Sequence, residues 1–374
     1  MKNNKRYLLG GIFIVMICFV VYTKHNLIIE KKDLNSILEE NYQSLKSIEN
    51  ENENVKYVTP YDFGAVGDGV TDDSDAFKKM FEYNNIYIPE GTFLLKCDNK
   101  DPSWLDVGGN FMTNGYFNIK SNTTIICSDK SLIKVKASDY KAYNVITIKG
   151  VENVKILGMN ILGDREEHIG NDGEFGFGIF IADSKNILIM NSKFSNMWGD
   201  GININTANTN YKNNEIFIKG CIFENNRRQG ISIESCDGAI IEDCVFNNTN
   251  GTLPESGVDI EPSHKSMYVK NIVFNNCEFN NNRIGLLIDG QFGKVSEVEV
   301  NNCTFYENRE KAQIYITKAK NIKVNNYNGI EDSITVNEDE SSIFVNSSRN
   351  IEVNGEKVKL NIISDIIKNI INKF

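Results

Sequence analysis

The sequence predicts an all-β chain built as a parallel β-solenoid, and two series of repeated positions carry that prediction. The first series is a glycine, or a glutamine in the last copy, followed by alternating apolar residues at steps of 23, 29, 27, 28 and 28: Gly178, Gly201, Gly230, Gly257, Gly285 and Gln313. The second series runs out of phase with the first and places a small residue two positions before a phenylalanine: Ser192, Cys221, Cys244, Cys277 and Cys303. Short strands at a fixed period, with asparagine-rich corners, are typical of coils that stack about 4.8 Å apart.

Composition limits the function classes. The chain has 374 residues, 41% of them hydrophobic, which is enough for a sizeable core. Its formal net charge of -10 argues against a nucleic-acid partner, because binding of the phosphate backbone needs a basic surface.

The N-terminal residues predict export. Residues 1–6 form a basic tail and residues 7–23 are uncharged, which favours an uncleaved transmembrane signal-anchor. A cleaved signal peptide is the alternative, although Lys24 and His25 do not form a small-residue cleavage site. The positive-inside rule keeps the basic tail in the cytoplasm, so we expect a single-pass protein of the cell membrane whose main domain is extracytoplasmic.

Residues 24–56 are charged and carry a few leucines and isoleucines at seven-residue spacing, which predicts a helical stalk or linker. A coiled coil needs three to four clean heptads, so the sequence gives no support for an oligomer. Residues 57–374 then form the predicted solenoid domain.

The cysteines of the second series share one repeat position, so we expect them to stack as a ladder of small apolar side chains inside the coil. Disulfides between stacked neighbours are the alternative, which export would permit. No Cys/His spacing typical of a metal site is present.

The stretch YVTPYDFGAVGDGVTDDSDAFKKMFE (57–82), with NNIYIPEGTFLL (84–95), resembles the entry segment of the pectate-lyase superfamily of right-handed parallel β-helices. Asp72, Asp73 and Ser74 are N-cap candidates for a helix that would plug the open end of the solenoid. The amphipathic stretch 361–374 predicts a helical cap at the other end, with contact to a membrane surface as the alternative.

Alternation along each strand after the repeated glycine defines two outward columns of side chains. The first column is Phe180, Asn203, Ser232, Asp259, Leu287 and Tyr315, and the second is Ala182, Asn205, Glu234, Glu261, Asp289 and Thr317. Like charges stacked one coil apart raise at least one pKa or require a cation, which is typical of a functional site. A purely structural acidic stripe is the alternative.

Other polar residues gather at the corners that lead into these strands. We expect them to wall a groove as substrate-binding residues, together with Glu234 and with His264 behind the acidic pair: Asp164, Arg165, His168, Trp198, Arg227 and Arg228. Packing at the rim for the tryptophan and structural ion pairs for the arginines are the alternatives.

Two branches of the superfamily resemble the central coils in part. The corner Trp198-Gly-Asp200-Gly201 looks like the polygalacturonase corner that supplies a catalytic aspartate, but Arg228-Gln229 replaces an Asp-Asp pair of that family, and Ser256-Gly257-Val258 replaces its Gly-His-Gly. The segment Ser256 to Glu261 resembles the Tyr-Gly-Phe-Asp-Pro-His-Asp segment of mannuronan epimerases, with a glutamate in place of the histidine.

We therefore expect a polysaccharide-active enzyme of the cell envelope, a glycoside hydrolase of an acidic or complex polysaccharide. Its catalytic residues are predicted to be Asp200, Asp259, Glu261 and Asp289. The backbones of Asp259 and Asp289 should lie about 8 Å apart, which favours inversion, with Glu261 as the acid. The alternatives are a polysaccharide lyase or uronate epimerase, and a non-catalytic glycan-binding protein. Hydrolysis requires no cofactor, whereas a lyase would add Ca²⁺.

Overall fold

The structure is a computed structural model that describes residues 56–97, 117–206, 213–309 and 313–329, and four short stretches of strand beyond them. The chain divides into two compact units, Met1–Lys56 and Tyr57–Phe374, and almost all described residues belong to the second. The predicted anchor, stalk and C-terminal helix lie outside the described residues. Within those residues, no helix has the length and apolar character needed to cross a bilayer.

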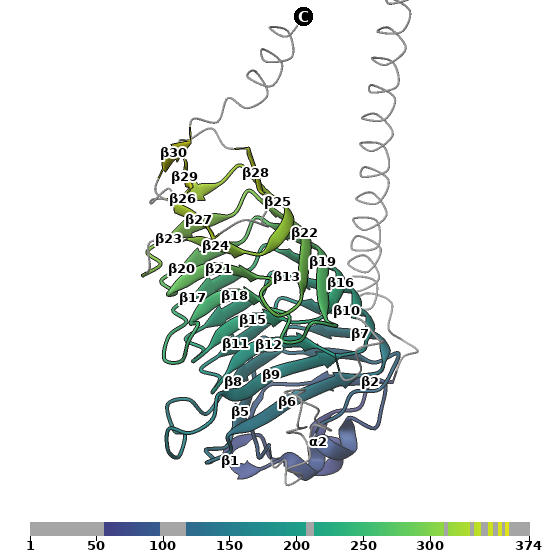
Figure 1. The fold of residues 1–374 in the computed structure, drawn as a ribbon. Coiled ribbons are helices and arrows are strands. Elements are labelled where there is room, and N and C mark those ends of the chain that lie inside the picture. The colour runs from purple at the N-terminus through teal and green to yellow at the C-terminus, as the bar shows by residue number, and fades with distance from the viewer. Residues whose placement is uncertain are drawn as a thin grey trace, which may run out of the picture. The chain divides into compact units, whose positions relative to one another are not determined.

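The described residues form three ten-stranded sheets (Figure 1). Sheet 1 contains β1 (Asp68–Asp72), β3 (Gly91–Leu95), β5 (Ser131–Val135), β8 (Asn160–Leu162), β11 (Lys193–Ser195), β14 (Ile222–Glu224), β17 (Val245–Asn247), β20 (Glu278–Asn280), β23 (Thr304–Tyr306) and β26 (Asn328–Gly329). Sheet 2 contains β2 (Asn85–Ile88), β4 (Thr124–Cys127), β7 (Glu152–Leu157), β10 (Lys185–Met190), β13 (Asn214–Lys219), β16 (Cys236–Glu242), β19 (Tyr268–Asn275), β22 (Lys294–Asn301), β25 (Ala319–Asn325) and β28 (Ile343–Asn346). Sheet 3 contains β6 (Ala142–Lys149), β9 (Phe175–Ala182), β12 (Asp200–Asn205), β15 (Gln229–Ile233), β18 (Ser256–Ile260), β21 (Ile284–Asp289), β24 (Ile314–Thr317), β27 (Ser333–Asn337), β29 (Ile351–Val353) and β30 (Glu356–Val358).

From β6 to β28 the chain visits sheets 3, 2 and 1 in turn, so each complete coil adds one strand to each sheet (Figure 1). Neighbouring strands pair in parallel, except for β29 with β30. The register aligns equivalent repeat positions: Phe194 pairs with Phe223, which pairs with Phe246. The predicted parallel β-solenoid is confirmed.

A 3-10 turn η1 (Pro60–Phe63) and one short helix, α2 (Ser74–Met80), lie at the N-terminal end of the described coils. Asp73 is the N-cap residue, yet its carboxylate accepts hydrogen bonds from the backbone N–H groups of Val66 and Gly67 instead of capping the helix. Phe77 is fully buried, and its ring lies 5.2 Å from that of Phe93. The role of α2 as a plug remains a prediction.

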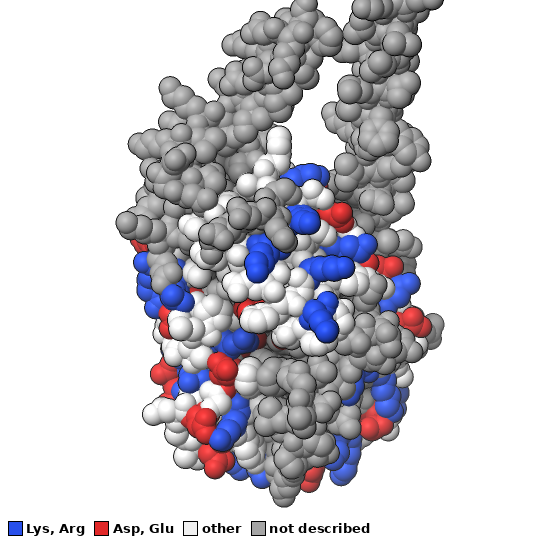
Figure 2. Space-filling model, viewed as in Figure 1, with Lys and Arg blue, Asp and Glu red and all other residues white. Residues whose placement is uncertain are grey.

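The described surface in Figure 2 mixes acidic and basic side chains. Several of these charges pair between adjacent coils, as in Lys193–Glu224 at 2.7 Å in sheet 1 and Lys323–Glu299 at 2.9 Å in sheet 2. Exposed ion pairs of this kind contribute little each, about 0–1 kcal/mol. The stack therefore depends mainly on its core.

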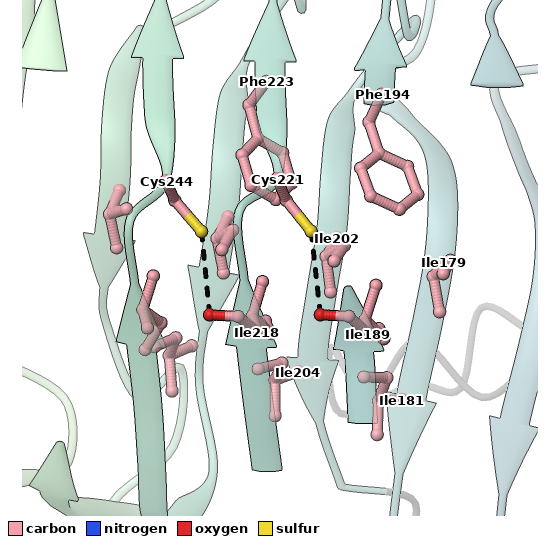
Figure 3. Packing of buried hydrophobic residues seen from close by; sticks show 14 of the residues in the cluster. Ile179, Ile181, Ile189, Phe194, Ile202, Ile204, Ile218, Cys221, Phe223 and Cys244 are labelled. Atoms are coloured by element: carbon pink, nitrogen blue, oxygen red, sulfur yellow. Dashed lines mark hydrogen bonds between the residues drawn. The ribbon is translucent and has the colours of Figure 1, made fainter. Parts of the chain in front are cut away.

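Apolar ladders fill the interior of the coils. The four cysteines of the second repeat series are free thiols, at most 1% exposed, and the predicted ladder is confirmed (Figure 3). Three of these thiols contact a backbone carbonyl one coil back: Cys221 Sγ donates to Ile189 O at 3.7 Å, Cys244 Sγ to Ile218 O at 3.6 Å and Cys277 Sγ to Ile241 O at 3.4 Å. Beside them a phenylalanine ladder stacks with ring centroids 4.6–5.3 Å apart: Phe194, Phe223, Phe246, Phe279 and Phe305.

The repeated glycines have a packing reason. A Cβ built on Gly230 would lie 2.5 Å from the carbonyl oxygen of Gly257 in the next coil and 2.7 Å from the ring of Phe246. Any side chain at this position would therefore push adjacent coils apart or displace the phenylalanine ladder. This close approach produces the glycine signature of the first repeat series.

Candidate functional site

The two predicted outward columns lie on sheet 3, but they are not a solvated face. Their inward neighbours, such as Ile231 and Val258, belong to the core. The first column points the opposite way and is nevertheless buried, with exposed fractions of 1–8% from Phe180 through Asp259 to Leu287. In the second column Glu234 and Glu261 are half-buried. The columns therefore point away from the core as predicted, but most of their members, including the carboxyl of Asp259, are buried.

A pocket of about 250 Å³ opens over this face. Strand β9 contributes two phenylalanines, the corner before β15 contributes an arginine, and the segment after β21 contributes a third phenylalanine. The lining residues are Phe175, Phe177, Arg228, Ser232, Glu234, Asp259, Glu261, Ser263 and Phe292. The pocket thus combines aromatic walls with carboxyl groups and a single guanidinium.

A hydrogen-bonded chain lies at the base of the pocket. The register of β12, β15 and β18 places Asp200 beside Gln229 and Ser232 beside Asp259. Arg228 Nη1 donates to Asp200 Oδ2 at 3.2 Å and to Gln229 Oε1 at 2.8 Å. Ser232 Oγ donates to Asp200 Oδ2 at 2.6 Å, and Gln229 Nε2 donates to Asp259 Oδ2 at 2.7 Å. Asp200, which is fully buried, is thereby linked to Asp259 through Arg228 and Gln229.

Burial raises the pKa of every carboxyl that the sequence assigns to catalysis. Burial raises the pKa of Asp200 to about 6, against the opposing charge of Arg228. Burial, then the charge of Glu261, raises the pKa of Asp259 well above its ordinary range. Burial, then the charge of Asp289, raises the pKa of Glu261, and burial raises that of Asp289 itself. The sequence predicts raised pKa values from crowding, and the structure makes burial the larger cause.

Asp259 and Glu261 interact directly. The charge of Glu261 adds to burial in raising the pKa of Asp259, so the two carboxyls are electrostatically coupled. Asp259 is the more deeply buried of the two, at 2% exposed, so burial favours its protonated form more strongly. Of the other acidic residues, Glu234 accepts a hydrogen bond from Asn203 Nδ2 at 3.1 Å, and Asp289 accepts one from the backbone N–H of Gln291 at 2.7 Å.

The structure brings together five of the predicted site residues, namely Asp200, Arg228, Glu234, Asp259 and Glu261. Asp289 is close enough to Glu261 to raise its pKa but does not line the pocket. The remaining predicted residues lie elsewhere: Asp164, Arg165, His168, Trp198, Arg227 and His264.

Most of those remaining residues form a separate packed cluster. His168 Nδ1 lies 2.8 Å from Asp164 Oδ2, and the hydroxyl of Tyr143 donates to Asp164 Oδ1 at 2.6 Å. Trp198 is 4% exposed and lies between the His168 ring, stacked at 3.6 Å, and the guanidinium of Arg227, 3.9 Å from its ring centroid. The predicted stacking aromatic of the groove is therefore packed against side chains instead.

Two further predictions also change. Arg165 donates to Asn225 O at 2.8 Å and to Asn250 Oδ1 at 2.7 Å, so it braces the corners of successive coils. His264 is exposed, and its Nδ1 lies 2.6 Å from Ser266 Oγ. Within the described part of the chain, no three His, Cys, Asp or Glu side chains are placed to hold a metal ion.

Sequence reasoning missed several residues of the pocket lining and one residue, Gln229, of the hydrogen-bonded chain at its base. Gln229 occupies the position in β15 that Asp200 occupies in β12, and that alignment was a usable signal. Phe175 and Phe177 come from a Phe-Gly-Phe-Gly stretch that reads as an ordinary strand, and Phe292 comes from a connecting segment outside the repeat. The repeat of the coils therefore gives no signal that these aromatic residues line a pocket.

These features define the class of the molecule as a parallel β-helix with an acidic, aromatic-walled pocket on one sheet. The family model described as "Right handed beta helix region" matches residues 117–328 and 212–367, so the chain belongs to that family. This confirms the right-handed parallel β-helix that the N-terminal segment resembles.

Relatives and solved structures agree with this assignment. The uncharacterized protein YclG of Bacillus subtilis (strain 168) is 30% identical over 220 residues, which are 54% of this chain and 37% of that protein. The chain spans less than half the length of the curated relatives it matches. The A-module of the mannuronan C-5 epimerase AlgE4 of Azotobacter vinelandii is similar with a TM-score of 0.52 and 15% identity, covering 80% of this chain and 95% of the module. The tailspike gp49 of Acinetobacter baumannii bacteriophage Fri1, a capsular polysaccharide depolymerase, has a TM-score of 0.52 and 14% identity, covering 84% of this chain and 66% of the tailspike. At these identities the likeness concerns the fold.

Proposed function

We propose that this chain is a polysaccharide-active enzyme, and in particular a glycoside hydrolase. The observation that carries the proposal is the pair of neighbouring carboxyls with raised pKa values, Asp259 and Glu261, in a pocket with aromatic walls. Aromatic side chains stack on sugar rings, and glycoside hydrolysis uses a carboxylic acid together with a carboxylate. The two structural neighbours, named for mannuronan and for a capsular polysaccharide, support a polysaccharide as the substrate.

Asp259 is the general acid in this proposal. Burial and then the charge of Glu261 raise the pKa of Asp259 well above its ordinary range, which favours the protonated form that a donor to the glycosidic oxygen needs. This replaces the expectation that Glu261 is the acid, because burial weighs more on Asp259. Arg228 stabilises the charge left behind, since its guanidinium lowers the pKa of both members of the pair.

The second carboxyl of the reaction is assigned outside this pair. Burial raises the pKa of both Asp259 and Glu261, so neither is the readily ionised carboxylate that the second role needs. Glu234 is the remaining carboxylate in the pocket lining, so it is assigned the role of base or nucleophile. Asp200 and Asp289 act as positioning residues: Asp200 holds Arg228, and Asp289 raises the pKa of Glu261.

A lyase or uronate epimerase is the second candidate, favoured by the likeness to the epimerase module. Such an enzyme needs a cation to neutralise the substrate carboxylate. Among the described lining residues Arg228 is the only cationic side chain, and it already contacts Asp200. Hydrolysis is therefore preferred. With the predicted N-terminal anchor, the enzyme would work on the outer side of the cell membrane.

The test is a screen of the full chain against bacterial and plant polysaccharides. New reducing ends without the ultraviolet absorbance of an unsaturated uronate identify a hydrolase, and that absorbance identifies a lyase. Asp259→Asn and Glu261→Gln should each lower turnover by at least about a hundredfold and leave the thermal midpoint unchanged or raised. The exposed acids Asp129 and Glu152 give matched controls, Asp129→Asn and Glu152→Gln. Full activity in both pocket variants would place the reaction elsewhere.

A further inference from the structure

The charges of the pocket do not balance. Three lining residues are carboxyls, Glu234, Asp259 and Glu261, and Arg228 is the one lining residue with a positive charge in the described part of the chain. Arg228 is matched by Asp200 at its base, 3.2 Å away. With Asp259 protonated as the proposed acid, Glu234 and Glu261 still have no cationic partner of their own in the described lining. A ligand of this pocket that brought positive charge would therefore remove an electrostatic penalty.

The pocket is also poor in hydrogen-bond donors. Asp259 is 2% exposed, its Oδ2 is held by Gln229, and its Oδ1 is buried with no donor from the protein. A buried oxygen without a partner calls for a polar group from the ligand. Of the two lining hydroxyls, that of Ser232 is directed at Asp200 and Gln229, and that of Ser263 lies 3.5 Å from Met267 Sδ. The described lining therefore presents mainly hydrogen-bond acceptors, so a ligand with N–H or O–H groups would complement it.

The walls select the kind of cation. Phe175, Phe177 and Phe292 present aromatic rings, and Phe292 is 60% exposed at the pocket. Aromatic faces attract ammonium groups and stack on sugar rings, but they provide no oxygen ligands for a metal ion. An ammonium group carries three donors and no acceptor, which matches the donor-poor lining. An organic ammonium thus fits both the walls and the floor.

We infer that the sugar unit recognised by this pocket carries a free amine, protonated at neutral pH, so that the substrate class is a polysaccharide containing non-acetylated amino sugars. The inference deepens the proposed function and rests on it for the sugar. The ammonium lies among Glu234, Asp259 and Glu261, and the ring of the sugar lies against the phenylalanines.

Binding of small probes to the full-length protein tests the inference. Saturation-transfer NMR measures glucosamine and galactosamine against their N-acetyl forms, against glucose and galactose, and against glucuronate. The two amines should bind at least about tenfold more tightly than the N-acetyl and neutral sugars, because one charge pair in a partly buried site is worth about that factor. Glu234→Gln should remove most of this preference, and the exposed control Glu152→Gln should keep it.

Several outcomes would overturn the inference: equal binding of amine and N-acetyl forms, tighter binding of glucuronate, no binding of either amine at millimolar concentration, or displacement of the amines by Ca²⁺ alone. Phe292→Ala, an exposed position that should not affect folding, gives a second arm: it should weaken binding of both amines severalfold. If an uncharged polysaccharide is hydrolysed and Asp259→Asn abolishes that activity while amines do not bind, only this inference fails. If amines bind and no polysaccharide is cleaved, the proposed hydrolase fails and the binding site remains.

Discussion

Asp200→Asn provides a quantitative test of the buried acidic site, through the pH dependence of folding. Burial raises the pKa of Asp200 from an ordinary 3.8 to about 6. Between these two pKa values the folded chain binds a proton that the unfolded chain releases. The free energy of unfolding therefore rises as the pH falls through 6, and this gain is complete below 3.8.

The size of the effect follows from the shift. A carboxyl with folded and unfolded pKa values of about 6 and about 4 adds about 1 kcal/mol to the free energy of unfolding between pH 7 and pH 5, and about 3 kcal/mol at the acidic limit. At about 2 °C for each kcal/mol in a chain of this size, the thermal midpoint should rise by about 2 °C from Asp200 alone. The raised pKa values of Asp259, Glu261 and Asp289 act in the same direction.

Urea unfolding followed by circular dichroism at pH 7 and pH 5 measures the gain. Asp200→Asn should lose about 1 kcal/mol of it, whereas the exposed Asp129→Asn should keep it whole. Ser232→Ala removes a hydrogen bond that lowers the pKa of Asp200, so the gain should begin at higher pH. A pH dependence of Asp200→Asn equal to that of the unmodified chain would show that Asp200 is not the buried, raised carboxyl described above.

Two further predictions concern the core. Phe279→Ala should lower the free energy of unfolding by about 3–5 kcal/mol, because the fully buried ring of Phe279 stacks between two other rings at 4.9 and 4.6 Å. In the same urea titration, the control Phe292→Ala at an exposed position should change the free energy of unfolding by less than about 0.5 kcal/mol. Equal losses of unfolding free energy in the two variants would mean that the phenylalanine ladder contributes no more stability than an exposed phenylalanine. Thiol reagents should label Cys221, Cys244, Cys277 and Cys303 only after denaturation, since their side chains are at most 1% exposed. Rapid labelling of these cysteines in the native chain would show that the inward and outward faces are assigned the wrong way round.

The sequence by itself determined the architecture, because the same packing requirements recur at the same positions of every coil. Gly230 has no room for a Cβ beneath Gly257, and each cysteine or phenylalanine of the second series stacks on its equivalent one coil away. Positions that recur with the period of the coil must lie above one another, so the spacing of about 28 residues was enough to predict the sheets, the inward faces and the thiol ladder.

The period also brought Asp259 and Glu261 close to Glu234, since these positions share two columns. It could not decide how much water reaches them. Only the tertiary structure decided that Asp200 is buried beneath Arg228 and that Trp198 packs against His168 and away from the pocket. The protonation of the site follows from that burial, because the pKa of a carboxyl depends on every atom around it and not on its position in a repeat.

The walls of the pocket were likewise decided in three dimensions. Phe292 lies in a connection between sheets, and Phe175 and Phe177 lie on β9, three strands from Asp259 on β18. Connections of irregular length do not repeat, so no spacing in the sequence predicts where their side chains meet. The local steric repeat fixes the scaffold and the acidic columns of this protein, whereas the walls of the pocket depend on connections that have no common period.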